Sequence, residues 1–139
     1  VLNSFQQIEN LPCVTVILID GVCLGGGYEM ALAFDYIIGI DHPSCQVGFP
    51  EINLGLLPGY GGSGRAFVRM GLEAALEMVL HGKPVRANDA LSIGALDHLV
   101  TDRDALADAA RMALGGGIER AIAVDCADPD ALIAKRHFN

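Results

Sequence analysis

Apolar residues form two short runs in the first third of the chain, and a glycine-rich stretch separates them. Residues 13–21 (CVTVILIDG) alternate and then become continuously apolar, which predicts a buried strand that ends at Gly21. Residues 36–40 (YIIGI) predict a second short strand. Between them, residues 25–34 (GGGYEMALAF) begin with glycines and continue with good helix formers. We therefore expect a helix that begins near Gly26 or Gly27.

The rest of the chain first becomes irregular and then regains a helical pattern. Residues 41–64 contain three prolines and frequent glycine, which predicts a long ordered loop with short strand pieces. After this loop the pattern predicts helices, each closed by glycine or opened by acidic residues, and one brief strand. The predicted helices are 63–71, 72–82, 87–94 and 102–116, and the predicted strand is 95–100.

The pattern weakens after Gly117, and residues 115–117 are the only internal stretch that resembles a linker. We therefore divide the chain into a domain of residues 1–114 and an extension of residues 115–139 that is helical or poorly ordered.

Composition places the chain among globular proteins. It has 139 residues, of which 52% are hydrophobic, enough for one domain with a real core. The apolar runs are shorter than the roughly 18 residues that cross a bilayer, so we expect no membrane span. Nothing at the start resembles a secretion leader, so we expect a cytoplasmic protein or a chain cut from something longer. The net charge of -8 opposes binding to nucleic acid.

Few residues indicate an ion or a phosphate. The four histidines show no HExxH-like grouping, and Cys13, Cys23, Cys45 and Cys126 show no CxxC pair, so we predict no metal site and interpret the cysteines as buried free thiols. Three cations, Lys83, Arg65 and Arg86, are candidates for phosphate contact, although solvated surface charge is the simpler interpretation of each.

The triple glycine at residues 25–27 suggests a site for an oxygen atom that carries negative charge. The first N–H groups of a helix have no partner inside the helix, and glycines allow a ligand to approach them closely. A tight turn that packs a strand against a helix explains the same glycines equally well. Sequence alone leaves both interpretations open.

Two carboxylates stand in apolar surroundings. Glu29 lies in the first turn of the predicted helix, where the helix dipole alone favours an acid by about 0.3–1 kcal/mol. Its apolar neighbours predict burial, and a buried carboxylate needs a partner, a proton or a catalytic role. Glu51 follows a proline in an apolar loop and raises the same question. Each alone is more often structural; together they suggest a general base and a general acid on either side of a water molecule.

Residues 59–64 (GYGGSG) match the glycine pattern of a dinucleotide-binding turn. The preceding residues 52–57 (INLGLL) are a poor strand, Pro58 adjoins the first glycine, and no repeating strand–helix–strand units follow. The serine-hydrolase elbow also fails, because Arg65 stands where its last glycine is required. We set both interpretations aside.

Three segments in succession resemble the crotonase family, also called the enoyl-CoA hydratase/isomerase family. They are IDGVCLGGGYEMALAFDYIIG, VGFPEINLGLLPGYGGSGR and LHGKPVRANDALSIGALDHLV, and the resemblance runs from about residue 11 to residue 114. The sequences of these segments are most similar to members that form the hydratase module of multifunctional fatty-acid oxidation enzymes. The resemblance implies an α/β crotonase-like (ClpP/crotonase) superhelix of repeated ββα units, present here in part.

The resemblance also implies roles for particular residues. Gly26 would donate its N–H to the thioester oxygen, Glu29 would activate water, and Glu51 would exchange a proton with the α-carbon of the substrate. Gly25 would lie beside the thioester, and Pro58 and Gly59 would lie near the acyl chain. Because both glutamates are present, the resemblance favours hydration of a 2-enoyl-CoA in fatty-acid β-oxidation, with isomerisation as a side activity.

The implied substrate is an acyl-CoA, whose coenzyme A is part of the substrate, so no separate cofactor is expected. The implied partners are further copies, in a trimer or hexamer, or a multifunctional complex. By the resemblance, we expect this sequence to correspond to roughly the second half of the family module, after the N-terminal portion that supplies a second oxyanion donor. Residues 118–139 do not clearly match the trimer-forming helices of the family. The alternative is a noncatalytic crotonase-like fragment that acts as an interaction module.

Overall fold

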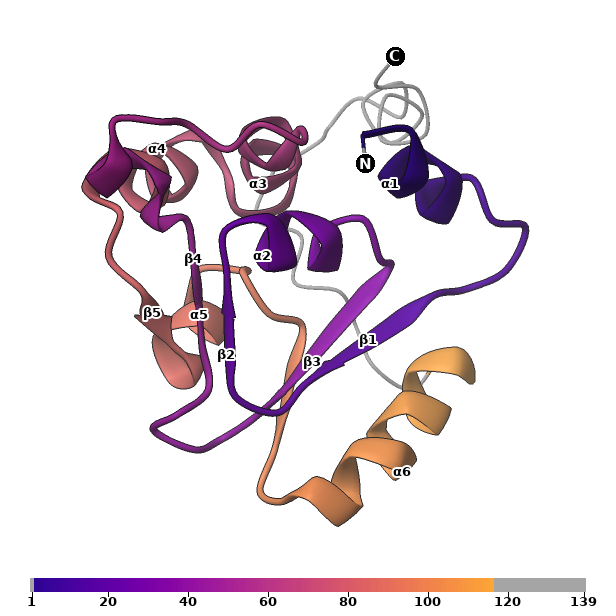
Figure 1. Cartoon of the computed structure of the whole chain (residues 1–139). Coiled ribbons are helices and arrows are strands. Elements are labelled where there is room, and N and C mark those ends of the chain that lie inside the picture. Colours follow the sequence, from indigo (N-terminus) through magenta and orange to yellow (C-terminus); the bar gives the residue numbers. More distant parts are fainter. Residues whose placement is uncertain (1, 117–139) are drawn as a thin grey trace.

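The computed structural model describes residues 2–116 of the chain (Figure 1). Its elements, in chain order, are α1 (Leu2–Glu9), β1 (Val16–Ile19), β2 (Val22–Leu24), α2 (Gly26–Ala31), β3 (Tyr36–Ile40), β4 (Gln46–Gly48), the 3-10 helix η1 (Pro50–Leu54), α3 (Gly62–Met70), α4 (Leu72–His81), β5 (Val85–Arg86), α5 (Ala87–Ser92), β6 (His98–Val100) and α6 (Arg103–Leu114).

The described strands form two small sheets. One sheet has the order β1-β3-β6 and is parallel throughout. The other has the order β2-β4-β5, in which β2 and β4 are parallel and β4 and β5 are antiparallel. The strand predicted over residues 13–21 is confirmed as β1, although it is shorter than predicted and ends at Ile19. After a turn at Asp20 and Gly21 the chain enters β2 in the other sheet, which was not predicted.

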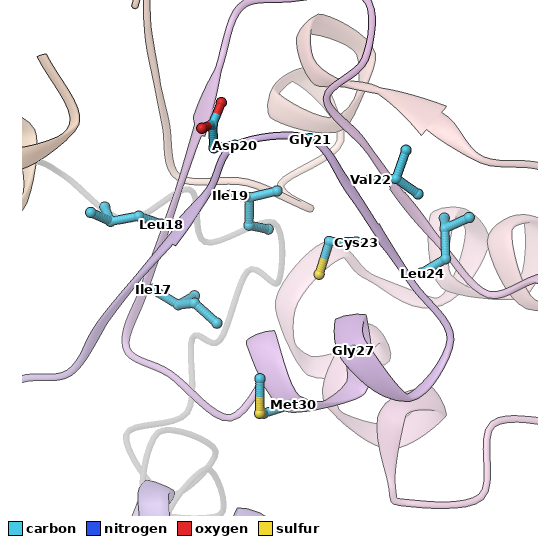
Figure 2. Close-up of a pocket in the computed structure, with 10 residues that line it drawn as sticks. All are labelled: Ile17, Leu18, Ile19, Asp20, Gly21, Val22, Cys23, Leu24, Gly27 and Met30. Carbon is cyan, nitrogen blue, oxygen red and sulfur yellow. The ribbon is translucent and has the colours of Figure 1, made fainter. Parts of the chain in front are cut away.

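The two strands that share this turn diverge, and a cavity opens between them. Figure 2 shows the side chains of Ile17 and Ile19 from β1 and of Cys23 from β2 around this space, with Met30 of α2 at its base. The cavity has a volume of ≈ 370 Å³. Neither Glu29 nor Glu51 lines it.

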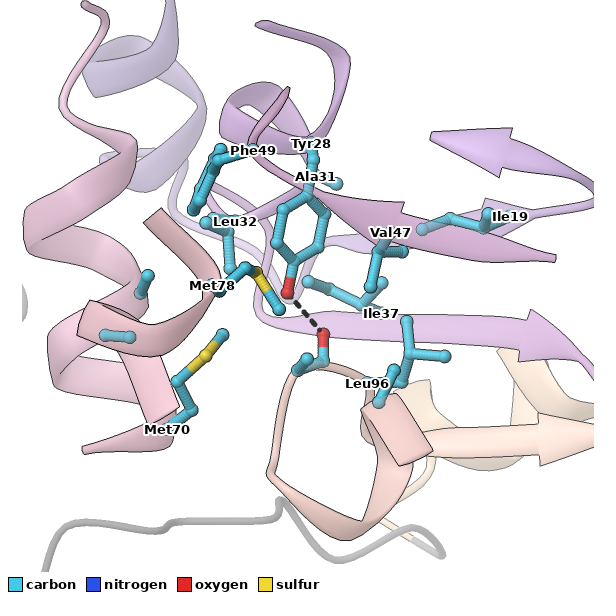
Figure 3. Close-up of a cluster of buried hydrophobic side chains, with 14 of the residues drawn as sticks. Ile19, Tyr28, Ala31, Leu32, Ile37, Val47, Phe49, Met70, Met78 and Leu96 are labelled. Atoms are coloured by element: carbon cyan, nitrogen blue, oxygen red, sulfur yellow. Dashed lines mark hydrogen bonds between the residues drawn. The ribbon is translucent and has the colours of Figure 1, made fainter. Parts of the chain in front are cut away.

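Strand β3 is buried on both faces and joins two apolar clusters. Ile37 belongs to the larger cluster, in which the ring of Tyr28 lies 5.2 Å from the ring of Phe49 (Figure 3). Ile38 points to the opposite side and packs in a second cluster beneath α6. A parallel strand covered on both faces is expected to be continuously apolar, as the sequence YIIGI is.

Several predictions from the pattern are confirmed. The second strand is β3, the glycine-opened helix is α2 and begins at Gly26, and the predicted loop contains β4 and η1. The later helices are α3 to α6, and Gly71 and Gly82 follow α3 and α4 as predicted. Helix α1 was not predicted. The division after residue 114 stays a prediction, because residues 117–139 lie outside the described part of the chain.

The prediction of buried thiols is correct for one of the three cysteines in the described range. Cys45 is buried, Cys23 is half-buried and Cys13 is exposed, and all three are free thiols. Partial burial raises the pKa of Cys23 to about 11, with a smaller contribution from Cys45 nearby. Cys126 lies outside the described residues. No helix within residues 2–116 is long and apolar enough to cross a membrane.

Candidate active site

The glycine turn between β2 and α2 is held against the neighbouring strand. The N–H of Gly25 donates to the carbonyl of Gly48 at 2.9 Å, and the φ of Gly25 is 56°, a conformation that favours glycine. No side chain caps α2 at this residue. The N–H groups of Gly26 and Gly27 lie in the first turn, where a helix supplies no acceptor of its own. The turn can therefore present backbone donors to an oxygen atom.

Glu29 is almost fully buried, and backbone N–H groups from another loop bind it. Its side-chain oxygen Oε1 accepts hydrogen bonds from the N–H of Tyr60 and the N–H of Gly62, each at 2.8 Å, and only 1% of the residue is exposed. Both of the hydrogen bonds that this carboxyl accepts within residues 2–116 are made by Oε1. Oε2 accepts neither of these two hydrogen bonds.

This arrangement depends on a second glycine. A Cβ at Gly62 would lie 2.5 Å from Cγ of Glu29, closer than side-chain atoms approach one another. The glycine at the start of α3 thus allows the helix backbone to approach the carboxyl. The partner that a buried Glu29 requires is a pair of amides rather than a cation.

Glu51 lies close to the same turn. It lies in η1, and its Oε1 is 3.0 Å from the position that a Cβ on Gly25 would occupy. Its Oε2 is buried and has no hydrogen-bond partner within the described range. Since the N–H of Glu29 donates to the carbonyl of Gly25 at 2.9 Å, both glutamates border one glycine turn.

The loop before α3 completes this region. Pro58 is half-buried and Gly59 is exposed, and they lead directly into Tyr60. The N–H of Tyr60 binds Glu29, and its ring lies 3.6 Å from a Cβ position on Gly26. Pro58 and Gly59 therefore adjoin Tyr60 in the chain, but a Cβ on Gly59 would meet nothing within 4 Å, so their own approach to the turn stays a prediction.

Sequence reasoning missed the contributions of Tyr60 and Gly62. Both donate from the backbone, and every residue except proline carries such a donor, so no residue type marked them. The one available signal was the density of glycine in residues 59–64, which permits close approach of the chain. The nucleotide interpretation of that stretch is not supported, because η1 and a loop precede it where a strand is required.

The surface interpretation of Arg65 is wrong. Its guanidinium forms a two-point salt bridge with Glu9 of α1, through Nε at 2.7 Å and Nη2 at 2.9 Å, and 12% of its side chain is exposed. Lys83 and Arg86 are exposed, as expected for solvated surface charges.

Among the described residues, no group of three or more His, Cys, Asp or Glu side chains could hold a metal ion.

The neighbouring Tyr28 locks α2 to the core. Its hydroxyl donates to the carbonyl of Ala95 at 2.9 Å (Figure 3). Burial raises the pKa of this phenol well above its usual range, Arg69 nearby lowers it in part, and Cys23 adds to the rise. Tyr28 therefore acts as a protonated donor, and it fixes the helix turn that carries Glu29.

Comparison with known proteins gives a consistent family. Residues 1–124 match the family model described as enoyl-CoA hydratase/isomerase. The chain is 47% identical over 95 residues to the fatty acid oxidation complex subunit alpha of Aliivibrio fischeri. The aligned region covers 68% of this chain and 14% of that protein. It is 43% identical over 117 residues to the same subunit of Vibrio vulnificus, covering 84% of this chain and 16% of that protein.

Solved structures show the same fold. The enoyl-CoA hydratase of Thermoplasma volcanium superposes with a TM-score of 0.75 at 26% identity, over 82% of this chain and 46% of that one. The enoyl-CoA hydratase of Bacillus anthracis gives a TM-score of 0.72 at 26% identity, over 83% of this chain and 43% of that one. The chain thus spans less than half of either structure and a much smaller share of the two curated relatives. It has a crotonase-like α/β fold, in part, and belongs to the enoyl-CoA hydratase/isomerase family.

Proposed function

We propose that this chain is the part of a 2-enoyl-CoA hydratase that carries both catalytic carboxyls and one oxyanion donor, and that the enzyme acts in fatty-acid β-oxidation. The observation that carries the proposal is the position of Glu29 and Glu51 beside the turn at Gly25 and Gly26. Family membership and relatives named as fatty acid oxidation complex subunits support the choice of substrate and pathway.

The proposed chemistry assigns one task to each group. Water adds across the C2=C3 bond of an enoyl thioester: the oxygen of water bonds to C3, and Glu29 accepts a proton from that water. Glu51 donates a proton to C2. Negative charge that develops on the thioester oxygen is stabilised by the N–H of Gly26, and each such donor contributes on the order of 10²- to 10³-fold in rate.

Isomerisation is proposed as a side activity, because moving a double bond needs proton exchange at carbon, the task proposed for Glu51, and no added water. Carboxyls perform every proposed proton transfer, so the reaction needs no metal or resident cofactor. Coenzyme A enters as part of the substrate. Gly25, Pro58 and Gly59 are proposed to contact the thioester and the acyl chain.

The proposed self-association has support from an apolar surface. Exposed leucines gather on one side of α4 and on the adjacent η1 loop, and exposed apolar groups on this scale promote association. They are Leu54, Leu56, Leu57, Leu72, Leu76 and Leu80. We propose that the enzyme forms a trimer or hexamer, or joins a multifunctional complex, and light scattering on the complete protein tests the first of these.

The function is tested by Glu29→Gln and Glu51→Gln in the complete natural protein. Each change keeps the shape of the side chain and removes its proton chemistry, so we expect crotonyl-CoA hydration to fall by about 10²- to 10⁴-fold in kcat. Glu73→Gln, an exposed position in the first turn of α4, is the matched control and should leave the rate unchanged.

Wild-type rates in both site variants would contradict the enzyme proposal. They would favour the second candidate, a noncatalytic interaction module with a crotonase-like fold. Affinity measurements with the leucine surface altered, for example Leu76→Glu, would then decide whether that surface binds a partner.

A further inference from the structure

The loop that binds Glu29 contains little that fixes its own conformation. Gly59, Gly61 and Gly62 surround Tyr60, and Gly61 adopts a φ of 86°, in the left-handed region. Glycine has the largest conformational freedom to lose on folding, so this stretch needs an external restraint to keep two N–H groups on one oxygen atom.

Arg65 supplies a restraint from one helical turn away. Its Nη1 donates to the carbonyl oxygen of Tyr60 at 2.7 Å, while the N–H of the same residue binds Glu29 at 2.8 Å. The backbone of Tyr60 is therefore held on both sides, by the guanidinium at its carbonyl and by the carboxyl at its N–H.

The guanidinium is itself held in one orientation by α1. Glu9 binds Nε and Nη2 at 2.7 and 2.9 Å, which leaves Nη1 directed at the loop. The ring of Phe5 lies 5.9 Å from the guanidinium carbon and 6.0 Å from the ring of Tyr60, in an edge-to-face arrangement. A planar guanidinium with a two-point carboxylate partner is more rigid than a lysine at the same place.

We propose that Arg65, oriented by Glu9, is a positioning residue that fixes the backbone of Tyr60 and thereby sets the orientation of the Glu29 carboxyl. This inference rests on the proposed function for its catalytic consequence. By this proposal α1, which precedes Glu29 by some twenty residues, contributes through Glu9 to the orientation of the Glu29 carboxyl.

The test is a double-variant cycle in the complete protein, with crotonyl-CoA as the substrate. Arg65→Met should lower kcat by about 10- to 100-fold, because misplacing a catalytic group by about 1 Å can have an effect of this order. KM should change by less than about threefold, since substrate binding is not altered. In the Glu29→Gln background the same change should lower kcat by less than about twofold, because the group that it positions is already inactive.

Two further variants distinguish positioning from folding. Arg65→Lys and Glu9→Gln keep most of the packing and should give smaller losses of kcat, Glu9→Gln the smaller of the two. If Arg65→Met does not fold, these two carry the test. The control is Arg111→Met, which removes an exposed arginine paired with Asp108 on α6 and should leave kcat unchanged.

Hydrogen exchange gives a readout that does not depend on the reaction. The amides of Tyr60 and Gly62 should exchange faster in Arg65→Met, and unchanged exchange would overturn the positioning role. An unchanged kcat in Arg65→Met, or an equal loss of kcat in both backgrounds, would also overturn it. Full activity of Glu29→Gln alone would instead contradict the proposed function, so the two failures are distinguishable.

Discussion

The two ends of helix α3 are attached to the rest of the molecule in different ways. At the C-terminal end, Arg69 forms a salt bridge with Asp97, and their side chains are 4% and 1% exposed. At the N-terminal end, Arg65 pairs with Glu9, whose side chain is 21% exposed, and the first residue, Gly62, donates its N–H to Glu29. One end is anchored in the core, and the other lies in a partly open region that contains the candidate chemistry.

This difference separates two tasks along a single nine-residue helix. The buried end fixes where α3 lies, because Asp97 also accepts the N–H of Ile37 in β3 at 2.7 Å. The glycine-rich end then needs only local restraints to aim its N–H groups. Changes at the buried end should therefore act mainly on stability, and changes at the glycine-rich end mainly on catalysis.

The largest expected effect on stability comes from Arg69→Met. Removal of one partner from a buried pair leaves the carboxylate of Asp97 buried without a cation, and this costs about 3–5 kcal/mol in the free energy of unfolding. Denaturant unfolding of the domain measures the loss, with Arg111→Met as the exposed control, which should stay within about 0.5 kcal/mol of wild type. A loss at Arg69 as small as at Arg111 would remove the contrast between the two ends.

A smaller effect is expected from Tyr28→Phe, close to the same anchor. The change removes the hydroxyl that donates to the carbonyl of Ala95 and leaves that buried acceptor unpaired, at a cost of about 1–3 kcal/mol in the free energy of unfolding. Mainly because of burial, the pKa of Tyr28 is raised above the ordinary value of 10.0, so the folded state favours the protonated phenol.

The sign of the pH dependence follows from that shift. The stabilisation from Tyr28 is fully present below pH 10.0 and is lost as the pH rises above it toward the higher pKa of the folded state. Unfolding measured between pH 8 and 11 should therefore show a steeper decline in wild type than in Tyr28→Phe. Parallel curves for the two proteins would show that the phenol does not contribute to this decline.

The sequence predicts the local elements better than it predicts these attachments. β3 and the start of α2 follow from apolar runs and glycine, because such signals lie within a few residues of the element that they specify. Helix α1 was missed because its eight residues contain only three apolar positions, Leu2, Phe5 and Ile8, too short a pattern to indicate a helix. The Asp20–Gly21 turn indicated the end of a strand but could not show that β2 would join a different sheet.

The candidate site was only partly predictable for the same reason. Burial of Glu29 follows from its apolar neighbours. Its pairing with Glu51 was suggested by two acids in apolar surroundings and supported by the family resemblance, since spacing alone places neither carboxyl. Arg69 and Asp97 are 28 residues apart, and Arg65 and Glu9 are 56 apart. Pairs at such separations are decided by packing of whole elements, which a local pattern does not encode.

Gly62→Ala tests the glycine-rich end, and here stability and activity should separate. The new Cβ would lie 2.5 Å from Cγ of Glu29, and a flexible side chain gives way more readily than backbone. We therefore expect the Glu29 carboxyl to lose its hydrogen bonds to the two backbone N–H groups. The rate of crotonyl-CoA hydration should then fall about 100-fold or more. Because Gly62 is the first residue of α3, alanine gains little there from helix propensity, and loss of the two hydrogen bonds to Glu29 should lower the free energy of unfolding by about 1–3 kcal/mol.

Gly64→Ala is the matched control, because it lies in the same helix and a Cβ there meets nothing within 4 Å. It should leave hydration unchanged and raise the free energy of unfolding by up to about 1 kcal/mol. If Gly62→Ala kept its activity, the amides of Tyr60 and Gly62 would not set the catalytic geometry of Glu29. If it instead unfolded the domain as strongly as Arg69→Met, the glycine-rich end would also be a structural anchor, and the division of tasks along α3 would fail.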